Sequence, residues 1–130
     1  MTHSAIQYAQ DVLSGEATAC RYVQLAAQRF LNDLERTDIW MDWQEANKVL
    51  NVISNFKQWK GKQSGDYITL QPHQQFILTN QFGFQKYNAD GNVVRRFNTS
   101  YEEVARKNAK TTIEAAKQLY HLCFENEHGP

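Results

Sequence analysis

The chain has 130 residues and no formal net charge, because its 14 Lys and Arg residues balance its 14 Asp and Glu residues. Hydrophobic residues make up 42% of it, which is enough for a packed core and excludes an intrinsically disordered chain. The N-terminus lacks the apolar core of a signal peptide, and no run approaches membrane-spanning length. We therefore expect a cytoplasmic protein with no membrane contact.

The N-terminal part of the chain predicts amphipathic helices. Residues 4–14 place apolar side chains at three- and four-residue spacing, and a similar stripe runs over residues 17–35. A further helix begins near Asp42 and runs to residue 56, because Asp42 and Glu45 have the spacing of a capping box. We expect the helices over 17–35 and 42–56 to pack together.

Residues 57–65 are rich in Lys and Gly and predict a surface loop. Pro72 suits the first position of a short helix over residues 72–81, since its missing N–H costs nothing there. Gly83 suits the end of that helix. This helix should pack on the ones before it.

The rest of the chain predicts strands and a final helix. Two β-like runs, 84–87 and 93–97, flank the turn signal Asp90-Gly91 of a β-hairpin. A strand at 101–105, a basic turn and a helix over 109–124 follow. Cys20 and Cys123 fall on apolar helix stripes and are expected to be reduced core residues. The four histidines are scattered, so no metal site is expected from them.

The basic turn has chemistry suited to phosphate. Lys110 can neutralise phosphate charge, and the hydroxyl of Thr111 can bind Mg²⁺, as in the P-loop between a strand and a helix. The Walker A pattern G-x-x-x-x-G-K-[ST] would require glycine where this chain has Val104 and Ala109. The residues by themselves leave open a phosphate loop or an ordinary basic helix start.

Several motifs occur in a fixed order along the chain: the segment from Leu70 to Gln74, then Phe82-Gly83-Phe84, Arg95-Arg96-Phe97 and the run from Ala105 to Thr111. In this order they resemble the start of the large terminase subunit of tailed bacteriophages and prophages. That family reads approximately L-x-P-W-Q, F-G-W, R-R-F and A-R-K-N-G-K-[ST]. The resemblance covers nearly the whole chain, from about Tyr8 to Glu127.

The resemblance implies an ATP-binding loop with Mg²⁺ as its metal. Gln74 corresponds to the glutamine of the family's adenine-contacting segment, where an amide suits both the donor and the acceptor of the base. Thr111 would be the metal ligand. His73 departs from the family's tryptophan, and Ala109 replaces a glycine whose left-handed conformation would cost another residue about 1–2 kcal/mol. The implied loop residues are Arg106, Lys107, Asn108, Ala109, Lys110 and Thr111.

The expected fold class is α/β, with a helical N-terminal region over 1–60 and the start of a P-loop ATPase-like domain over 61–130. This second part holds the opening strands, the P-loop-like turn and the helix of an incomplete P-loop NTPase domain. The resemblance implies an intact protein that packages double-stranded DNA with ATP and also cuts it. Its partners would be DNA, the small terminase subunit and the portal, inside a bacterial host cell, and it could form an oligomer.

In the family, the acidic residues that bind Mg²⁺ and activate water follow the P-loop helix, so we expect this chain to be a truncated, non-catalytic fragment. The alternative is a non-catalytic DNA- or protein-binding module derived from a prophage terminase.

We therefore expect the 130-residue polypeptide to have no measurable ATPase activity, because the carboxylates that position Mg²⁺ and water are missing from it. Phosphate release from ATP measures this directly. Turnover above background that Lys110→Ala abolishes would contradict the prediction.

Overall fold

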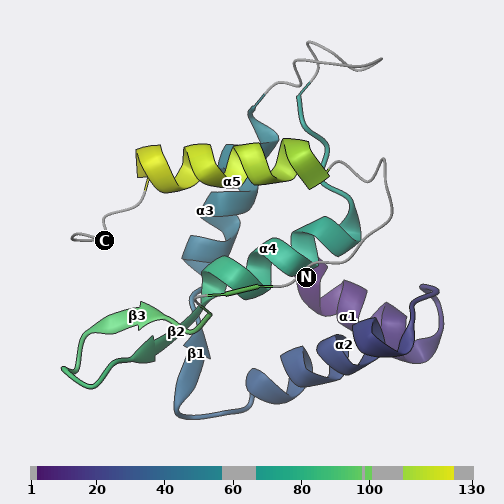
Figure 1. The fold of residues 1–130 in the computed structure, drawn as a ribbon. Helices are drawn as coiled ribbons and strands as arrows, with labels where there is room; N and C mark the ends of the chain where they lie inside the picture. Colours follow the sequence, from purple (N-terminus) through teal and green to yellow (C-terminus); the bar gives the residue numbers. More distant parts are fainter. Residues whose placement is uncertain (1–2, 57–66, 98, 101–109, 125–130) are drawn as a thin grey trace.

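The computed structural model describes residues 3–56, 67–97, 99–100 and 110–124. The loop predicted over 57–65 and the strand predicted over 101–105 lie outside these ranges. None of the helices within them is long and apolar enough to cross a membrane. The elements, shown in Figure 1, are α1 (Ser4–Ser14), α2 (Arg21–Asp33), β1 (Ile39–Met41), α3 (Trp43–Ser54), α4 (Pro72–Gly83), β2 (Phe84–Tyr87), β3 (Val93–Arg95) and α5 (Lys110–Phe124).

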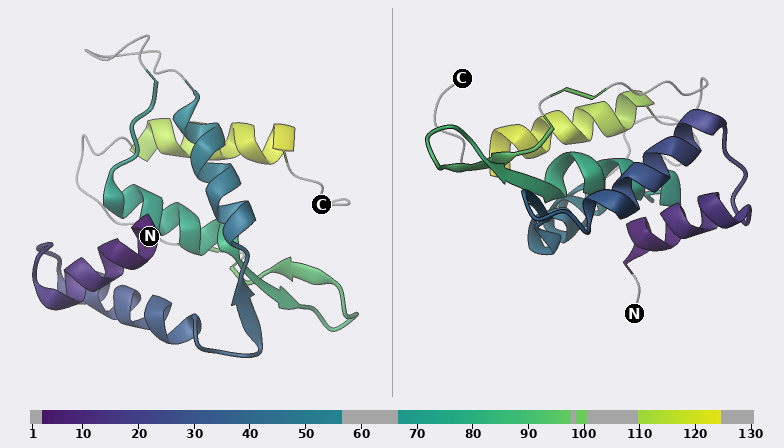
Figure 2. Two further views of the ribbon diagram at one scale, coloured as in Figure 1. Left: turned by 180° about the vertical axis from the view of Figure 1, so that it is seen from behind. Right: turned by 90° about the horizontal axis from the view of Figure 1, so that it is seen from below.

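Helix α4 lies at the centre of the molecule, with α1 and α2 on one side and α3 and α5 on the other (Figures 1 and 2). It is buried on two faces, and its Phe76 and Leu78 belong to separate core clusters. The expectation that the second and third helices pack together is therefore wrong. Helix α2 packs mainly on α1, because α4 offers a separate apolar face to each pair of helices.

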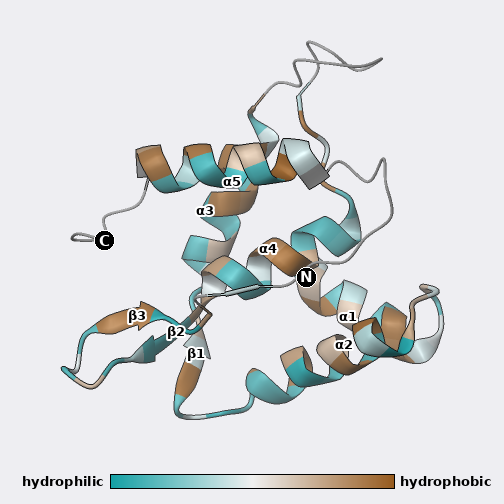
Figure 3. Cartoon of the chain, in the orientation of Figure 1, coloured by the Kyte–Doolittle hydropathy of each residue, from teal (hydrophilic) through white to brown (hydrophobic). Residues whose placement is uncertain are grey.

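The two core clusters explain the periodic patterns of the sequence. Figure 3 shows hydrophobic and hydrophilic residues alternating along α2 and α5, as expected of amphipathic helices. One cluster joins α3, α4 and α5 through Val49, Ile53, Leu78, Phe82, Ile113, Ala116 and Tyr120, with Ile68 and Leu70. The other joins α1, α2, β1, α4 and β2 through Ala5, Ala9, Val12, Ala27, Phe30, Ile39, Phe76 and Phe84.

The start of α3 confirms the predicted N-cap. The Asp42 carboxylate accepts hydrogen bonds from the backbone N–H groups of Gln44, at 3.1 Å, and Glu45, at 3.2 Å. The backbone N–H of Asp42 donates to the carbonyl oxygen of Gly83, at 2.8 Å. Asp42 therefore ties the start of α3 to the end of α4.

The strands form an antiparallel sheet in the order β1-β2-β3. The predicted hairpin is confirmed, with Gly91 at a φ of +81° in its turn, although β3 ends at Arg95 rather than at Phe97. Strand β1 was not predicted, because three residues are too few for an alternating pattern. It becomes a strand by pairing with β2, far along the chain.

Both cysteines are exposed, so their predicted place in the core is wrong. Cys20 is the N-cap residue of α2 and precedes the helical turns that carry the apolar stripe. Cys123 lies near the C-terminal end of α5, which extends beyond α3 (Figures 1 and 2). Helical spacing places a residue on a stripe, but the stripe is buried only as far as its partner helix reaches.

A buried ion pair joins the N-terminal helices to the hairpin. The carboxylate of Asp33, whose side chain is 7% exposed, pairs with the Arg96 guanidinium, whose side chain is 18% exposed. The guanidinium also lies over the ring of Phe97, 4.7 Å from its centroid, and over the ring of Phe84, at 5.7 Å. Arg36 approaches the same carboxylate at 3.6 Å, but its side chain is 44% exposed.

Asp33→Ala should lower the free energy of unfolding by about 3 kcal/mol, because it leaves a poorly solvated guanidinium without its carboxylate. Asp38→Ala is the matched control: it removes the exposed partner of Arg36 and should cost less than about 1 kcal/mol. Urea unfolding measures both values. Equal losses in the two variants would contradict the role given to the Asp33–Arg96 pair.

Candidate nucleotide-binding site

The N-terminus of α4 carries the predicted base-contacting residue. Gln74 is buried, and its side-chain oxygen accepts the backbone N–H of Gln71 at 2.8 Å. The Gln71 side chain accepts a backbone hydrogen bond from the first turn in return, which completes a capping box, and Pro72 occupies the first turn. The Gln74 oxygen is thus engaged in holding the start of the helix.

The N-terminus of α5 carries the predicted phosphate-binding residues. Lys110 is the first residue of the helix, one position after the predicted start, and Thr111 follows it with an exposed side chain. The first backbone N–H groups of a helix have no acceptor within it, and the helix dipole makes this end favourable for anions. Buried Ile113 fixes which side of this turn faces the core.

The two helix N-termini lie at the same end of the molecule. Helices α4 and α5 run in nearly the same direction in the views of Figures 1 and 2. Leu78 and Phe82 of α4 and Tyr120 of α5 belong to one core cluster, and the rings of Phe82 and Tyr120 lie 5.3 Å apart in an edge-to-face arrangement. The fold therefore brings Gln74 and Thr111, which are far apart in sequence, to the same end.

The rest of the predicted loop lies outside the described residues: Arg106, Lys107, Asn108 and Ala109, together with the side chain of Lys110. Their part in phosphate binding stays a prediction. Within the described ranges, no group of three or more His, Cys, Asp or Glu residues could hold a metal ion. Thr111 is the only predicted metal ligand in those ranges, and its exposed hydroxyl at a helix N-terminus fits a phosphate-bound Mg²⁺.

A side-chain hydrogen bond between α3 and α5 holds α5 in place. The Tyr120 hydroxyl donates to the Glu45 carboxylate at 3.3 Å, and burial of the ring, together with that negative charge, raises the pKa of Tyr120 to about 12. Tyr120 therefore remains protonated near neutral pH and keeps its donor. Glu45, predicted as half of a capping box, here anchors α5.

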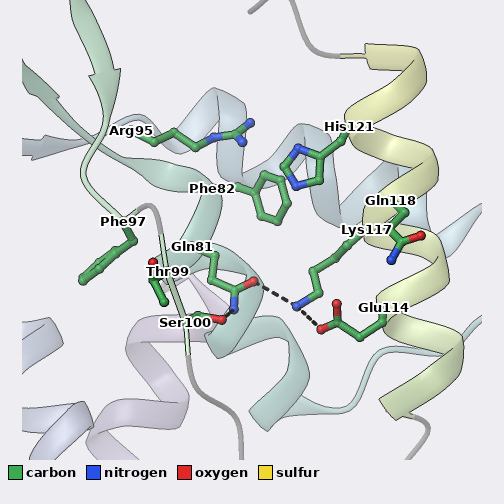
Figure 4. Close-up of a pocket in the computed structure, with 10 residues that line it drawn as sticks. All are labelled: Gln81, Phe82, Arg95, Phe97, Thr99, Ser100, Glu114, Lys117, Gln118 and His121. Atoms are coloured by element: carbon green, nitrogen blue, oxygen red, sulfur yellow. Dashed lines mark hydrogen bonds and ion pairs between the residues drawn. The ribbon is translucent and has the colours of Figure 1, made fainter. Parts of the chain in front are cut away.

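A polar pocket of about 190 Å³ lies beside the middle of α5 (Figure 4). It is smaller than the roughly 300–1,000 Å³ of typical ligand pockets, so it does not suit a nucleotide. In the sequence, only the charge of Lys117, which interrupts the apolar stripe of the final helix, indicated such a pocket. Its lining residues come from α4, from β3 and the segment after it, and from α5: Gln81, Phe82, Arg95, Phe97, Thr99, Ser100, Glu114, Lys117, Gln118 and His121.

The capping box predicts that Gln74→Ala lowers the free energy of unfolding by about 1 kcal/mol, because the Gln71 N–H loses its acceptor. Gln74→Glu should cost much less, since a carboxylate accepts the same bond and a negative charge is favourable near a helix N-terminus. Thermal unfolding of the parent and the two variants tests whether Gln74→Ala is less stable than Gln74→Glu. Equal loss in both variants would show that the cap contributes little.

Residues 72–130 match the family model described as terminase large subunit, ATPase domain. No curated protein and no solved structure matches the chain. The match begins at the first residue of α4 and includes the hairpin and α5, so it contains both helices that form the candidate site. The resemblance drawn from the ordered motifs is confirmed over residues 72–130, where the chain is similar to the ATPase domain of the terminase large subunit.

Proposed function

We propose that this chain is the N-terminal part of a phage-type terminase large subunit, and that it binds ATP weakly without hydrolysing it. The observation that carries the proposal is the family match over residues 72–130, which includes the α4 and α5 N-termini at one end of the fold. The small antiparallel sheet and the helices around it are compatible with an α/β domain. The P-loop character of that domain is implied by the family.

In this proposal each predicted residue has one role at the shared end of α4 and α5. Lys110 and Arg106 neutralise phosphate charge, and the first backbone N–H groups of α5 bind phosphate oxygens. The Thr111 hydroxyl would hold Mg²⁺, which neutralises charge on the phosphates when bound. Gln74 selects the base through its amide.

The intact protein, in the same proposal, is an ATP-driven DNA-packaging motor and nuclease of a bacteriophage or prophage. It would act on double-stranded DNA with the small terminase subunit and the portal, in the cytoplasm of the bacterial host. Residues 1–60 would form a helical region ahead of the ATPase domain that begins at residue 61. Both core clusters include α4, so this helical region supports the domain that binds the nucleotide.

A second candidate function is a non-catalytic interaction module, and the outer face of the sheet favours it. Tyr87 and Val93 are paired across β2 and β3 and are 64% and 56% exposed. The Trp40 ring lies 4.9 Å from that of Tyr87. Neighbouring exposed apolar side chains of this kind mark contact surfaces for another macromolecule. Such a module would function without ATP.

Calorimetric titration of ATP into the parent and an Ala109→Gly variant distinguishes the two functions. A phosphate loop predicts tighter binding in the variant, because glycine removes the Cβ and restores backbone freedom at the family's glycine position. The gain should be roughly 5- to 30-fold if about 1–2 kcal/mol of strain is relieved. Binding should prefer triphosphate over monophosphate and should be lost in Lys110→Ala.

Ala115→Gly is the matched control, since Ala115 is exposed in the interior of α5 and the substitution lowers helix stability by up to about 1 kcal/mol. It should leave ATP affinity unchanged. If Ala109→Gly gains no affinity and only lowers stability as the control does, then residues 106–112 are an ordinary basic helix start.

A further inference from the structure

The side-chain amide of Gln81 joins three segments of the chain in the polar pocket (Figure 4). Its NH₂ group donates to the hydroxyl oxygen of Ser100 at 2.6 Å. Its oxygen accepts a hydrogen bond from the ammonium group of Lys117 at 3.3 Å. Gln81 lies near the end of α4, Ser100 follows the hairpin, and Lys117 lies on α5.

Lys117 makes this arrangement energetically important, because it is only 7% exposed. Its ammonium group lies 2.5 Å from the carboxylate of Glu114, one helical turn earlier, whose side chain is 53% exposed. A buried ammonium group is stable only where oxygen atoms replace its water shell. The Gln81 oxygen is one of those atoms, so the amide is tied to the burial of α5 against α4.

The two partners of Gln81 stand on either side of the predicted phosphate-binding segment in the sequence. Ser100 precedes that segment, and α5 begins at Lys110 directly after it. One amide on α4 therefore fixes the position of the chain before the segment and the position of the helix after it. Since the distance between these two points limits how the residues between them can be arranged, the two Gln81 hydrogen bonds constrain that segment from its flanks.

We propose that Gln81 is a positioning residue that holds on α4 the two parts of the chain that flank the predicted phosphate-binding segment. Its effect on ATP rests on the proposed function, but the tether itself does not. The position requires a side chain that satisfies a hydroxyl and an ammonium group together. Glutamine does so with one donor and one acceptor, and glutamate also can, because the Ser100 hydroxyl can rotate to donate. Leucine has a similar size and makes neither bond.

Hydrogen exchange of the full chain tests the tether. In Gln81→Leu, the hydrogen-bonded amides of residues 114–118 should exchange roughly tenfold faster, the effect of losing about one net hydrogen bond. The amides of α1 and α2 should keep the rates of the parent. Gln81→Glu should restore slow exchange in α5, which a general loss of packing would not allow. Gln118→Leu is the control, since Gln118 lines the same pocket and none of the side-chain hydrogen bonds seen among the described residues involves its amide group.

Unchanged exchange of α5 in Gln81→Leu would overturn the inference, and so would equal acceleration in α1, α2 and α5. ATP titration of the same variants then separates the two proposals. If the parent binds ATP, Gln81→Leu should weaken binding roughly tenfold while Gln81→Glu and Gln118→Leu bind as the parent does. If the parent binds no ATP while exchange still depends on Gln81, the proposed function fails and the tether stands.

Discussion

The two-sided burial of α4 is the constraint on which the rest of the structure depends. A helix that contacts solvent on one side needs only one apolar face, but α4 places Phe76 in one core cluster and Leu78 in the other. It must also end abruptly, because β2 follows it without a loop. Gly83 makes this possible: a Cβ at that position would collide with the sulfur of Met41 and crowd Ala46. The C-terminal end of α4 can therefore pack against both α3 and the sheet.

The Asp33–Arg96 pair extends this arrangement to the N-terminal helices. Arg96 lies within the family match, whereas Asp33 lies in the helical region before it. Because a partly buried charge destabilises a fold strongly once its partner is removed, the two regions depend on each other for stability. Edge-to-face contacts of Phe30 with Phe76 and Phe84 add apolar burial across the same junction. The N-terminal helices thus support the part of the chain that matches the ATPase domain.

In the proposed function, the two ends of α5 have different roles. Its N-terminus offers backbone N–H groups and Thr111 beside the start of α4, which is suited to anions. Its middle and C-terminal part are held by polar contacts, from Tyr120 to Glu45 and from Lys117 to Gln81. Polar anchors of this kind have strict geometry, so they fix the helix in one position where apolar contacts alone would tolerate sliding. A fixed helix is what a site at its N-terminus requires.

The sequence by itself determined the features that depend on neighbouring residues. Apolar spacing located α1, α2, α3 and α5, Asp42 and Pro72 marked helix starts, and Asp90-Gly91 marked the hairpin turn, because caps and turns are decided within a few residues. The ordered motifs also indicated the terminase family and placed Gln74, Lys110 and Thr111 at helix N-termini. The tertiary structure alone decided that Ile39–Met41 is a strand, that both cysteines are exposed and that α4 separates α2 from α3. It also decided that Gln81, which belongs to none of the sequence motifs, joins Ser100 and Lys117. Each of these outcomes depends on which distant segment lies opposite a residue, and the pattern of its sequence neighbours does not encode that.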